Sequence, residues 1–304
     1  MQHAGTGIAI ILGLYVTCAG VLHAQTAGAP ISHEEASRQQ GIYRSQGEDV
    51  PRGYVIDRGL AAYASALPPE FDRNLSTLGT ADRWLDIGAG EGRAILDYYG
   101  ALSDTSRTKA QGVAVSIEDR RTKAWYQAAE RLESNKIRYF FGKSLSDYTM
   151  DELGKFQIIT DLLGGLSYTR NLSRFMEKTL GFLHVNGSFY SILQDVHSEE
   201  GSNPPHYTGA PYLTEIVNTD GSKTKICAWL KSISCVQVTC ELRPRWTPPV
   251  EVYRVQKVCD NVSVPPLAPL HFAAGTPPER RFQLQPASPT PPAQVTTPPQ
   301  PARP

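Results

Sequence analysis

Three glycines at alternate positions, with an acidic residue just before them, are the residues of this chain best suited to hold a ligand. They lie in the segment RWLDIGAGEGR, residues 83–93, where Asp86 comes two residues before the first glycine. We call residues 88–92 the glycine turn. Its glycines are Gly88, Gly90 and Gly92. Because glycine has no Cβ, this backbone can adopt positive φ and approach a ligand closely at the start of a helix. Arg93 stands where a dinucleotide fingerprint has its last glycine, and this disfavours a diphosphate ligand. The alternative to a ligand-binding role is a tight strand-to-helix turn that holds no ligand.

The segment resembles the first motif of the class I S-adenosylmethionine-dependent methyltransferases, which has an acidic residue and one spacer before G-x-G-x-G. The resemblance implies S-adenosyl-L-methionine as the cofactor. It implies that Asp86 helps to place the amino-acid part of this cofactor. It also implies that the backbone of Gly88, Ala89, Gly90 and Gly92 passes close to the cofactor.

Two further cofactor-binding positions depart from the pattern of that family. The family usually ends its second strand with a carboxylate that binds the ribose, but Ala114 stands there, so Glu118 is the candidate. The alternative for Glu118 is a place in the first turn of a helix, where the helix dipole favours a carboxylate. After the third strand the family often has Gly-Asp-Ala, whose acid bonds the adenine amine, whereas this chain has Gly-Lys-Ser. Lys143 cannot accept that bond, so Ser144 or Asp147 is expected to substitute.

Asp161 and Tyr168 are the candidate catalytic residues. Asp161 ends the expected fourth strand, and Tyr168 lies in the following segment, where the resemblance places residues that face the methyl group. Methyl transfer from a sulfonium is an in-line displacement, so an enzyme aligns the partners and removes a proton from a hydroxyl nucleophile. His197 is a third group that could orient or deprotonate a substrate. The alternatives are structural: Asp161 caps a loop, Tyr168 packs beneath the sheet and His197 is solvated. The methyl acceptor is expected to be a small molecule or a protein group, and no motif identifies it.

Strand-like and helix-like segments alternate along the chain and must position these residues. Runs of β-branched and aromatic residues predict strands at 83–87, 112–116, 137–141, 156–161, 187–193, 236–239 and 250–255. Helical spacing predicts helices at 59–67, 95–99, 124–132 and 172–183. Ser116 and Asp119 predict a capping box for the third of these helices. The βαβαβ order predicts an α/β fold, a doubly wound, Rossmann-like sheet with helices on both faces. The resemblance implies seven strands, mostly parallel, with the last one reversed, and ligands bind beyond the carboxyl ends of such strands.

The ends of the chain differ in character from this central domain. Residues 1–24 contain a short apolar run and a plausible cleavage site, which predicts a secretory signal that leaves no stable membrane span after cleavage. An uncleaved anchor is the alternative. Residues 25–45 are expected to be a flexible lead-in, residues 46–265 the methyltransferase-like domain, and residues 266–304 a proline-rich disordered tail.

Charge and cysteines bound the compartment and the partners. The chain has 30 Lys and Arg against 30 Asp and Glu, so no basic field is available to grip nucleic acid. Signal cleavage would leave four cysteines, Cys227, Cys235, Cys240 and Cys259. An even number fits disulfides in a periplasmic or secreted protein, with three pairings open, and buried thiols in a cytoplasmic protein are the alternative. No metal is expected, because the cysteines lack C-x-x-C spacing and no histidine lies among them. The sequence does not indicate an oligomeric state.

Overall fold

The structure is a computed structural model that describes residues 58–100, 109–132, 136–169, 171–194, 215–243, 250–268, 270–272 and 282–284. The predicted secretory signal, the predicted lead-in and His197 lie outside the described residues, as does most of the predicted tail.

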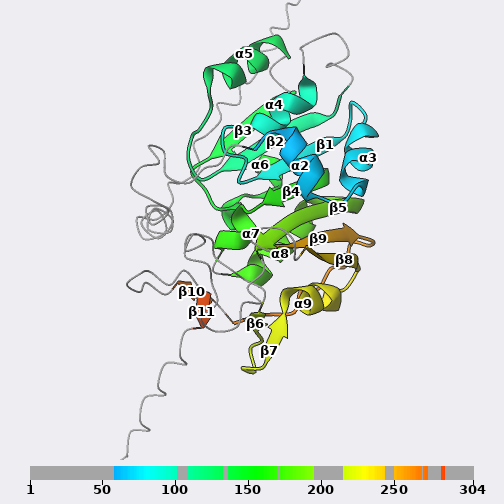
Figure 1. The fold of residues 1–304 in the computed structure, drawn as a ribbon, viewed down its shortest axis with the longest axis vertical. Coiled ribbons are helices and arrows are strands. Elements are labelled where there is room, and N and C mark those ends of the chain that lie inside the picture. The colour runs from blue at the N-terminus through cyan, green and yellow to red at the C-terminus, as the bar shows by residue number, and fades with distance from the viewer. Residues whose placement is uncertain are drawn as a thin grey trace, which may run out of the picture.

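A seven-stranded sheet forms the centre of the molecule, in the order β3-β2-β1-β4-β5-β9-β8 (Figure 1). The strands are β1 (Arg83–Ile87), β2 (Gln111–Ser116), β3 (Ile137–Phe141), β4 (Phe156–Leu162), β5 (Leu183–Gln194), β8 (Val236–Arg243) and β9 (Val250–Lys257). The pairs from β3 to β5 are parallel, whereas β9 runs antiparallel to both β5 and β8. The prediction of a doubly wound, mostly parallel sheet whose last strand is reversed is therefore confirmed.

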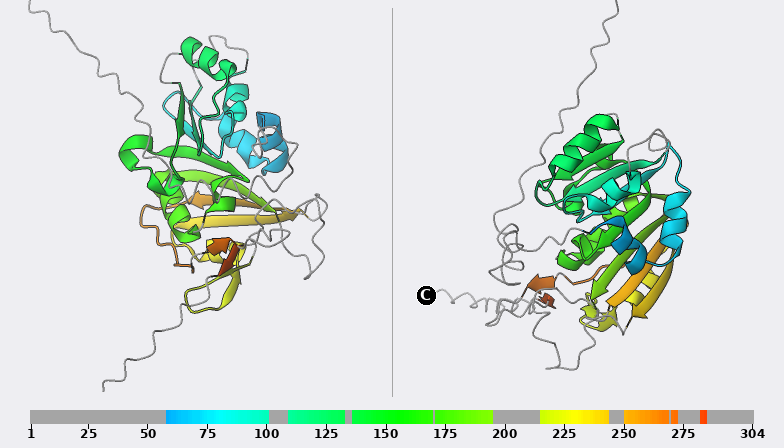
Figure 2. Two further views of the ribbon diagram at one scale, coloured as in Figure 1. Left: turned by 90° about the vertical axis from the view of Figure 1, so that its left-hand side faces the viewer. Right: turned by 45° about the horizontal axis from the view of Figure 1, so that its top comes forward.

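Helices cover both faces of this sheet, as the two further views show (Figure 2). One face carries α2 (Leu60–Ala66), α3 (Glu70–Ser76), α4 (Arg93–Tyr99) and α5 (Lys123–Arg131). The other carries η2 (Leu145–Asp147), α6 (Met150–Leu153), α7 (Gly165–Tyr168), α8 (Leu172–Phe182) and α9 (Ile226–Ser232). Successive strand residues point to opposite faces, so Trp84 enters the core beneath α2 to α5 and Leu85 enters the core beneath α8. The sequence did not predict the short helices α3, η2, α6, α7 and α9.

Two short antiparallel pairs complete the described chain. They are β6 (Glu215–Val217) with β7 (Lys223–Lys225), and β10 (Leu270–Phe272) with β11 (Phe282–Leu284). Leu267 is buried and its N–H donates to Ser173 Oγ at 2.8 Å, while the N–H of Ala268 donates to the Val217 carbonyl at 3.0 Å. Contacts with the folded domain thus reach three residues into the segment predicted as a tail.

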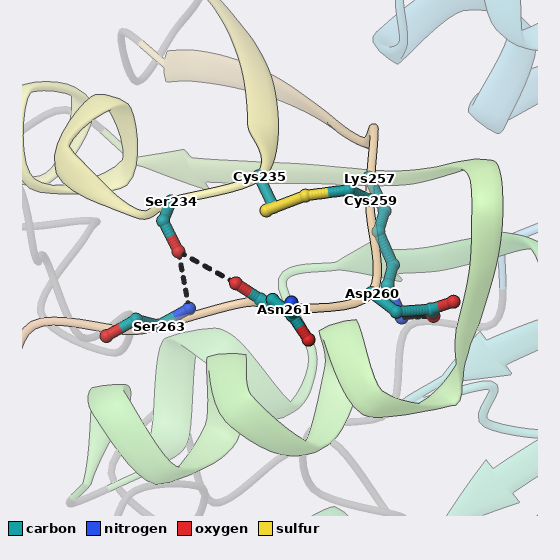
Figure 3. The surroundings of a disulfide bond; sticks show 7 residues. All are labelled: Ser234, Cys235, Lys257, Cys259, Asp260, Asn261 and Ser263. Atoms are coloured by element: carbon teal, nitrogen blue, oxygen red, sulfur yellow. Dashed lines mark hydrogen bonds and ion pairs between the residues drawn. A yellow bond between two sulfur atoms is a disulfide. The ribbon is translucent and has the colours of Figure 1, made fainter.

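Two disulfide bonds join the four cysteines. Cys227 in α9 pairs with Cys240 in β8, with Cα atoms 6.2 Å apart. Cys235, just before β8, pairs with Cys259, just after β9, with Cα atoms 5.1 Å apart (Figure 3). The first bond ties α9 to the middle of β8, and the second joins the two ends of the β8–β9 hairpin. This pairing supports an oxidising, exported environment.

Candidate functional site

The glycine turn connects the carboxyl end of β1 to α4. The angle φ is +69° at Gly88, +56° at Gly90 and +76° at Gly92, so all three glycines adopt the left-handed conformation that other residues avoid. The N–H groups of Gly88 and Ala89 donate to the carbonyl of Val115 at 2.9 and 3.2 Å. The turn is therefore held against the carboxyl end of β2.

Packing alone requires a glycine at two of these positions. A Cβ on Gly88 would lie 2.8 Å from the Cα of Gly164 in the β4–α7 loop. A Cβ on Gly92 would lie 2.4 Å from Cζ3 of Trp125 in α5. Both distances are shorter than real Cβ contacts, so a side chain at either position would displace its neighbour. The tight turn thus has a structural cause in addition to any ligand.

Asp86 lies at the centre of a buried polar network. The hydroxyl of Tyr63 in α2 donates to both carboxylate oxygens at 2.8 Å, and Thr160 Oγ1 in β4 donates to Oδ1 at 2.7 Å. Trp84 Nε1 donates in turn to Thr160 Oγ1 at 2.9 Å. Burial and the adjacent Asp86 raise the pKa of Tyr63 well above its ordinary value, so its hydroxyl stays a donor at neutral pH. The network holds the Asp86 carboxylate in one orientation.

Asp161 is completely buried at the carboxyl end of β4, next to β1. Its Oδ1 accepts the N–H of Gly164 and its Oδ2 accepts the N–H of Leu166, both at 2.7 Å. Burial raises the pKa of Asp161 to about 7 against the lowering effect of these two N–H groups, and the charge of Asp86 raises it further. The carboxyl group therefore holds the loop that leads to α7 and titrates near neutral pH.

Arg58 lies near the two buried acids. Its Nη1 donates to the carbonyl of Leu162 at 3.4 Å, and its charge lowers the pKa of Asp161. Sequence reasoning missed Arg58 and Tyr63, because the segment before β1 carries no motif. Thr160 could have been noticed as the polar residue directly before Asp161 in β4.

Glu118 forms an ion pair with Arg120, with Oε2 and Nη2 2.8 Å apart, and its side chain is 43% exposed. It lies in the loop between β2 and α5, at the same carboxyl edge of the sheet as the glycine turn. The ribose role for Glu118 remains a prediction.

The predicted capping box of Ser116 and Asp119 is wrong. α5 begins at Lys123, and Thr122 is its N-cap, accepting the N–H of Trp125 at 3.4 Å. Glu118 and Asp119 therefore precede the helix instead of lying in its first turn. Asp119 instead binds the guanidinium of Arg121 through both oxygens, at 2.8 and 2.7 Å, which lowers the pKa of Asp119.

The turn after β3 carries the other candidate residues. Lys143 forms an ion pair with Glu152 of α6 at 2.5 Å. Ser144 comes just before η2, and its carbonyl accepts the N–H of Asp147 at 3.0 Å. The basic Lys143 is thus neutralised by an acid of the chain itself.

Tyr168 is the last residue of α7, and its side chain lies outside the described part of the structure. Its catalytic role, like that of Asp161, remains a prediction. His197 lies outside the described residues.

One group of three possible metal ligands comes together among the described residues. Its members are Cys227, Cys240 and Glu251. The two cysteines form a disulfide, and Glu251 Oε2 accepts a hydrogen bond from the Tyr253 hydroxyl at 2.6 Å, so this group is not a metal centre. Within the same described ranges, no helix has the length and apolar character needed to cross a membrane.

The strand order, the single reversed strand and the glycine turn at the carboxyl end of β1 define a Rossmann-like fold of the class I methyltransferase type. No protein-family model and no curated protein sequence matches the chain. Solved structures do match it, several of them methyltransferases, one of which is described as a putative class I S-adenosylmethionine-dependent methyltransferase from Listeria monocytogenes.

One such structure is an rRNA methylase from Streptococcus thermophilus, 12% identical over 63% of this chain and 95% of that chain, with a TM-score of 0.40. Another is the N-methyltransferase NodS from Bradyrhizobium japonicum WM9 in complex with S-adenosyl-L-homocysteine, 12% identical over 72% of this chain and 98% of that chain, with a TM-score of 0.43. These similarities assign no activity, so function is inferred below from the residues of this chain.

Proposed function

We propose that this protein binds S-adenosylmethionine at the glycine turn and transfers its methyl group to a small molecule or a protein group. The observation that carries this proposal is the glycine turn itself, with three positive-φ glycines directly after the buried Asp86. The turn follows β1, which lies between β2 and β4, where the strand order reverses. Open α/β sheets bind their ligands at this point.

Asp86 and the glycine turn would hold the amino-acid part of the cofactor, while Glu118 and Ser144 would lie on the side of its nucleoside. When bound, the cofactor supplies a sulfonium methyl group. The chain itself would align the acceptor and remove a proton from it. Asp161 suits the second task because its pKa of about 7 lies near neutral pH, and Tyr168 follows it in the same loop. The two loop N–H groups bound to Asp161 favour a role in holding that loop as well.

A second candidate function is an exported, non-catalytic module that keeps the fold and binds a different ligand. The specific observation in its favour is that the cationic Lys143, paired with Glu152, stands where an adenine-binding acid is expected. The predicted export adds to this, since S-adenosylmethionine is made in the cytoplasm and an exported enzyme would need it delivered. A cytoplasmic enzyme is the alternative, and the two disulfides weigh against it.

Calorimetric titration of S-adenosylmethionine into the full chain, produced in an oxidising compartment, tests the proposal. We expect micromolar binding that Asp86→Asn weakens at least tenfold. Asp151→Asn is the matched control, since Asp151 is an exposed acid of α6 and should leave binding unchanged. Thermal unfolding of each variant checks that it is folded. The absence of binding at millimolar ligand would overturn the methyltransferase proposal and leave the non-catalytic module as the better account.

A further inference from the structure

The contacts of Tyr63 connect α2 to the candidate site. Its hydroxyl reaches both oxygens of Asp86 at 2.8 Å, 23 residues away along the chain. Tyr63 is only 3% exposed and Asp86 is fully buried, so no water competes for this contact. A hydrogen bond to a charged group in such surroundings is stronger than one between neutral groups. Removing the hydroxyl would leave the carboxylate one donor short and less well oriented.

The start of α2 is bound to the elements on either side of the site. The N–H of Leu60 donates to Asp97 Oδ2 in α4 at 3.1 Å. Asp97 also pairs with Arg93 at 2.8 Å, and Arg93 is the first residue after the glycine turn. Arg58 donates to the carbonyl of Leu162 at the end of β4. Residues 58–63 thus contact α4, which follows the glycine turn, the end of β4 and the carboxylate of Asp86.

We propose that Tyr63 is a positioning residue that fixes the Asp86 carboxylate and thereby couples the docking of α2 to ligand binding at the glycine turn. The ligand part of this inference rests on the proposed function. The coupling is reciprocal, because a ligand that binds the docked state more tightly must also favour docking. Tyr63 acts on the ligand only through Asp86.

Tyr98 provides a matched control for Tyr63. Both tyrosine rings pack edge-on against Trp84, with centroids 6.3 Å away for Tyr63 and 5.6 Å away for Tyr98. The hydroxyl of Tyr98 accepts the N–H of Ala110 at 3.2 Å, whereas only that of Tyr63 reaches Asp86. Tyr63→Phe and Tyr98→Phe therefore remove the same atom from the same aromatic cluster, with and without the carboxylate contact.

Hydrogen exchange on the ligand-free full chain is the first arm of the test. Tyr63→Phe should speed the exchange of the amides of residues 60–66, and Tyr98→Phe should leave it close to that of the wild type. Unchanged exchange in Tyr63→Phe would overturn the proposal even in the absence of any ligand.

A double-mutant cycle with S-adenosylmethionine is the second arm. Tyr63→Phe should weaken binding by about tenfold in the wild-type background and have no further effect in Asp86→Asn. Equal losses of binding affinity in Tyr63→Phe and Tyr98→Phe would show a merely structural role and overturn the proposal. The same tenfold weakening by Tyr63→Phe in the Asp86→Asn background would do so as well. If the wild-type protein does not bind, the proposed function fails and the coupling to this ligand fails with it, while the exchange arm still decides whether Tyr63 holds α2.

Discussion

Replacing Gly92 by alanine should destabilise the protein by about 3 kcal/mol, whereas Gly142→Ala should cost only about 1 kcal/mol. Both glycines have positive φ, +76° at Gly92 and +87° at Gly142, so both substitutions carry the penalty of a left-handed alanine, about 1 kcal/mol. A Cβ at Gly142 would meet nothing within 4 Å. At Gly92 it would lie 2.4 and 2.6 Å from two ring atoms of the buried Trp125, and overpacking a core costs about 1–3 kcal/mol more.

Urea unfolding followed by circular dichroism gives both free energies on the same oxidised full chain. Trp125→Leu removes the ring, so in that background Gly92→Ala should cost only about the left-handed penalty of 1 kcal/mol. Equal losses for Gly92→Ala and Gly142→Ala would refute the reasoning. Such a result would mean that the Trp125 ring moves aside freely, and a ligand would then be the better explanation for the glycine.

Three further predictions concern buried polar groups and disulfides. The pKa of Asp161, about 7 in the folded protein against an ordinary value near 4, means that the folded state keeps a proton that the unfolded chain releases. The stabilisation by the protonated carboxyl group is present below about pH 4 and is lost as the pH rises to about 7. The free energy of unfolding should therefore fall by about 4 kcal/mol over that interval in the wild type, and Asp161→Asn should remove this fall, measured by urea unfolding at several pH values. The disulfide between Cys227 and Cys240 joins residues 13 positions apart, and replacing both by alanine should lower the free energy of unfolding by about 3 kcal/mol. Adding reductant to this variant should cause no further destabilisation through this pair of residues. Lys257→Met should cost about 1–3 kcal/mol in the same assay, because the buried ammonium donates to a β5 carbonyl at 3.1 Å, and Asp260→Asn should cost clearly less because Asp260 is exposed.

The fold could be predicted because its signals are local. The apolar runs 112–116 and 156–161 form strands in any context that buries both faces, and β2 and β4 lie where these runs predict them. The start of α5 could not be predicted in the same way. Asp119 is of a residue type that often caps helices, but the guanidinium of Arg121, two residues away, is a stronger, charged partner for it. Thr122 therefore caps the helix.

The disulfide pairing also needed the structure. Four cysteines allow three pairings, and the register of the β8–β9 hairpin selects one of them. Val236 lies opposite Lys257, which places Cys235 beside the residues that follow β9 and brings it to Cys259. Cys240 lies further along β8 and meets Cys227 on α9, a helix that the sequence did not predict.

The sequence predicted which strands carry Asp86 and Asp161 but not the groups that contact these acids. Asp86 and Asp161 do end neighbouring parallel strands, as the strand pattern indicates. The groups that bind Asp86 come from 23 and 74 residues away, and no local pattern connects them to it. Sequence reasoning therefore finds the acids and misses the donors that decide how those acids behave.

Those donors bear directly on the choice between an enzyme and a binding module. A buried carboxylate without donors is costly, and Tyr63 and Thr160 remove that cost for Asp86. Because they also fix its orientation, a cationic ligand group that adds to the existing contacts would bind without reorganising the site. A ligand that had to displace the Tyr63 hydroxyl would lose a buried, charged hydrogen bond and bind correspondingly more weakly. Tight binding that depends on both Asp86 and Tyr63 is therefore the behaviour that an active cofactor site requires.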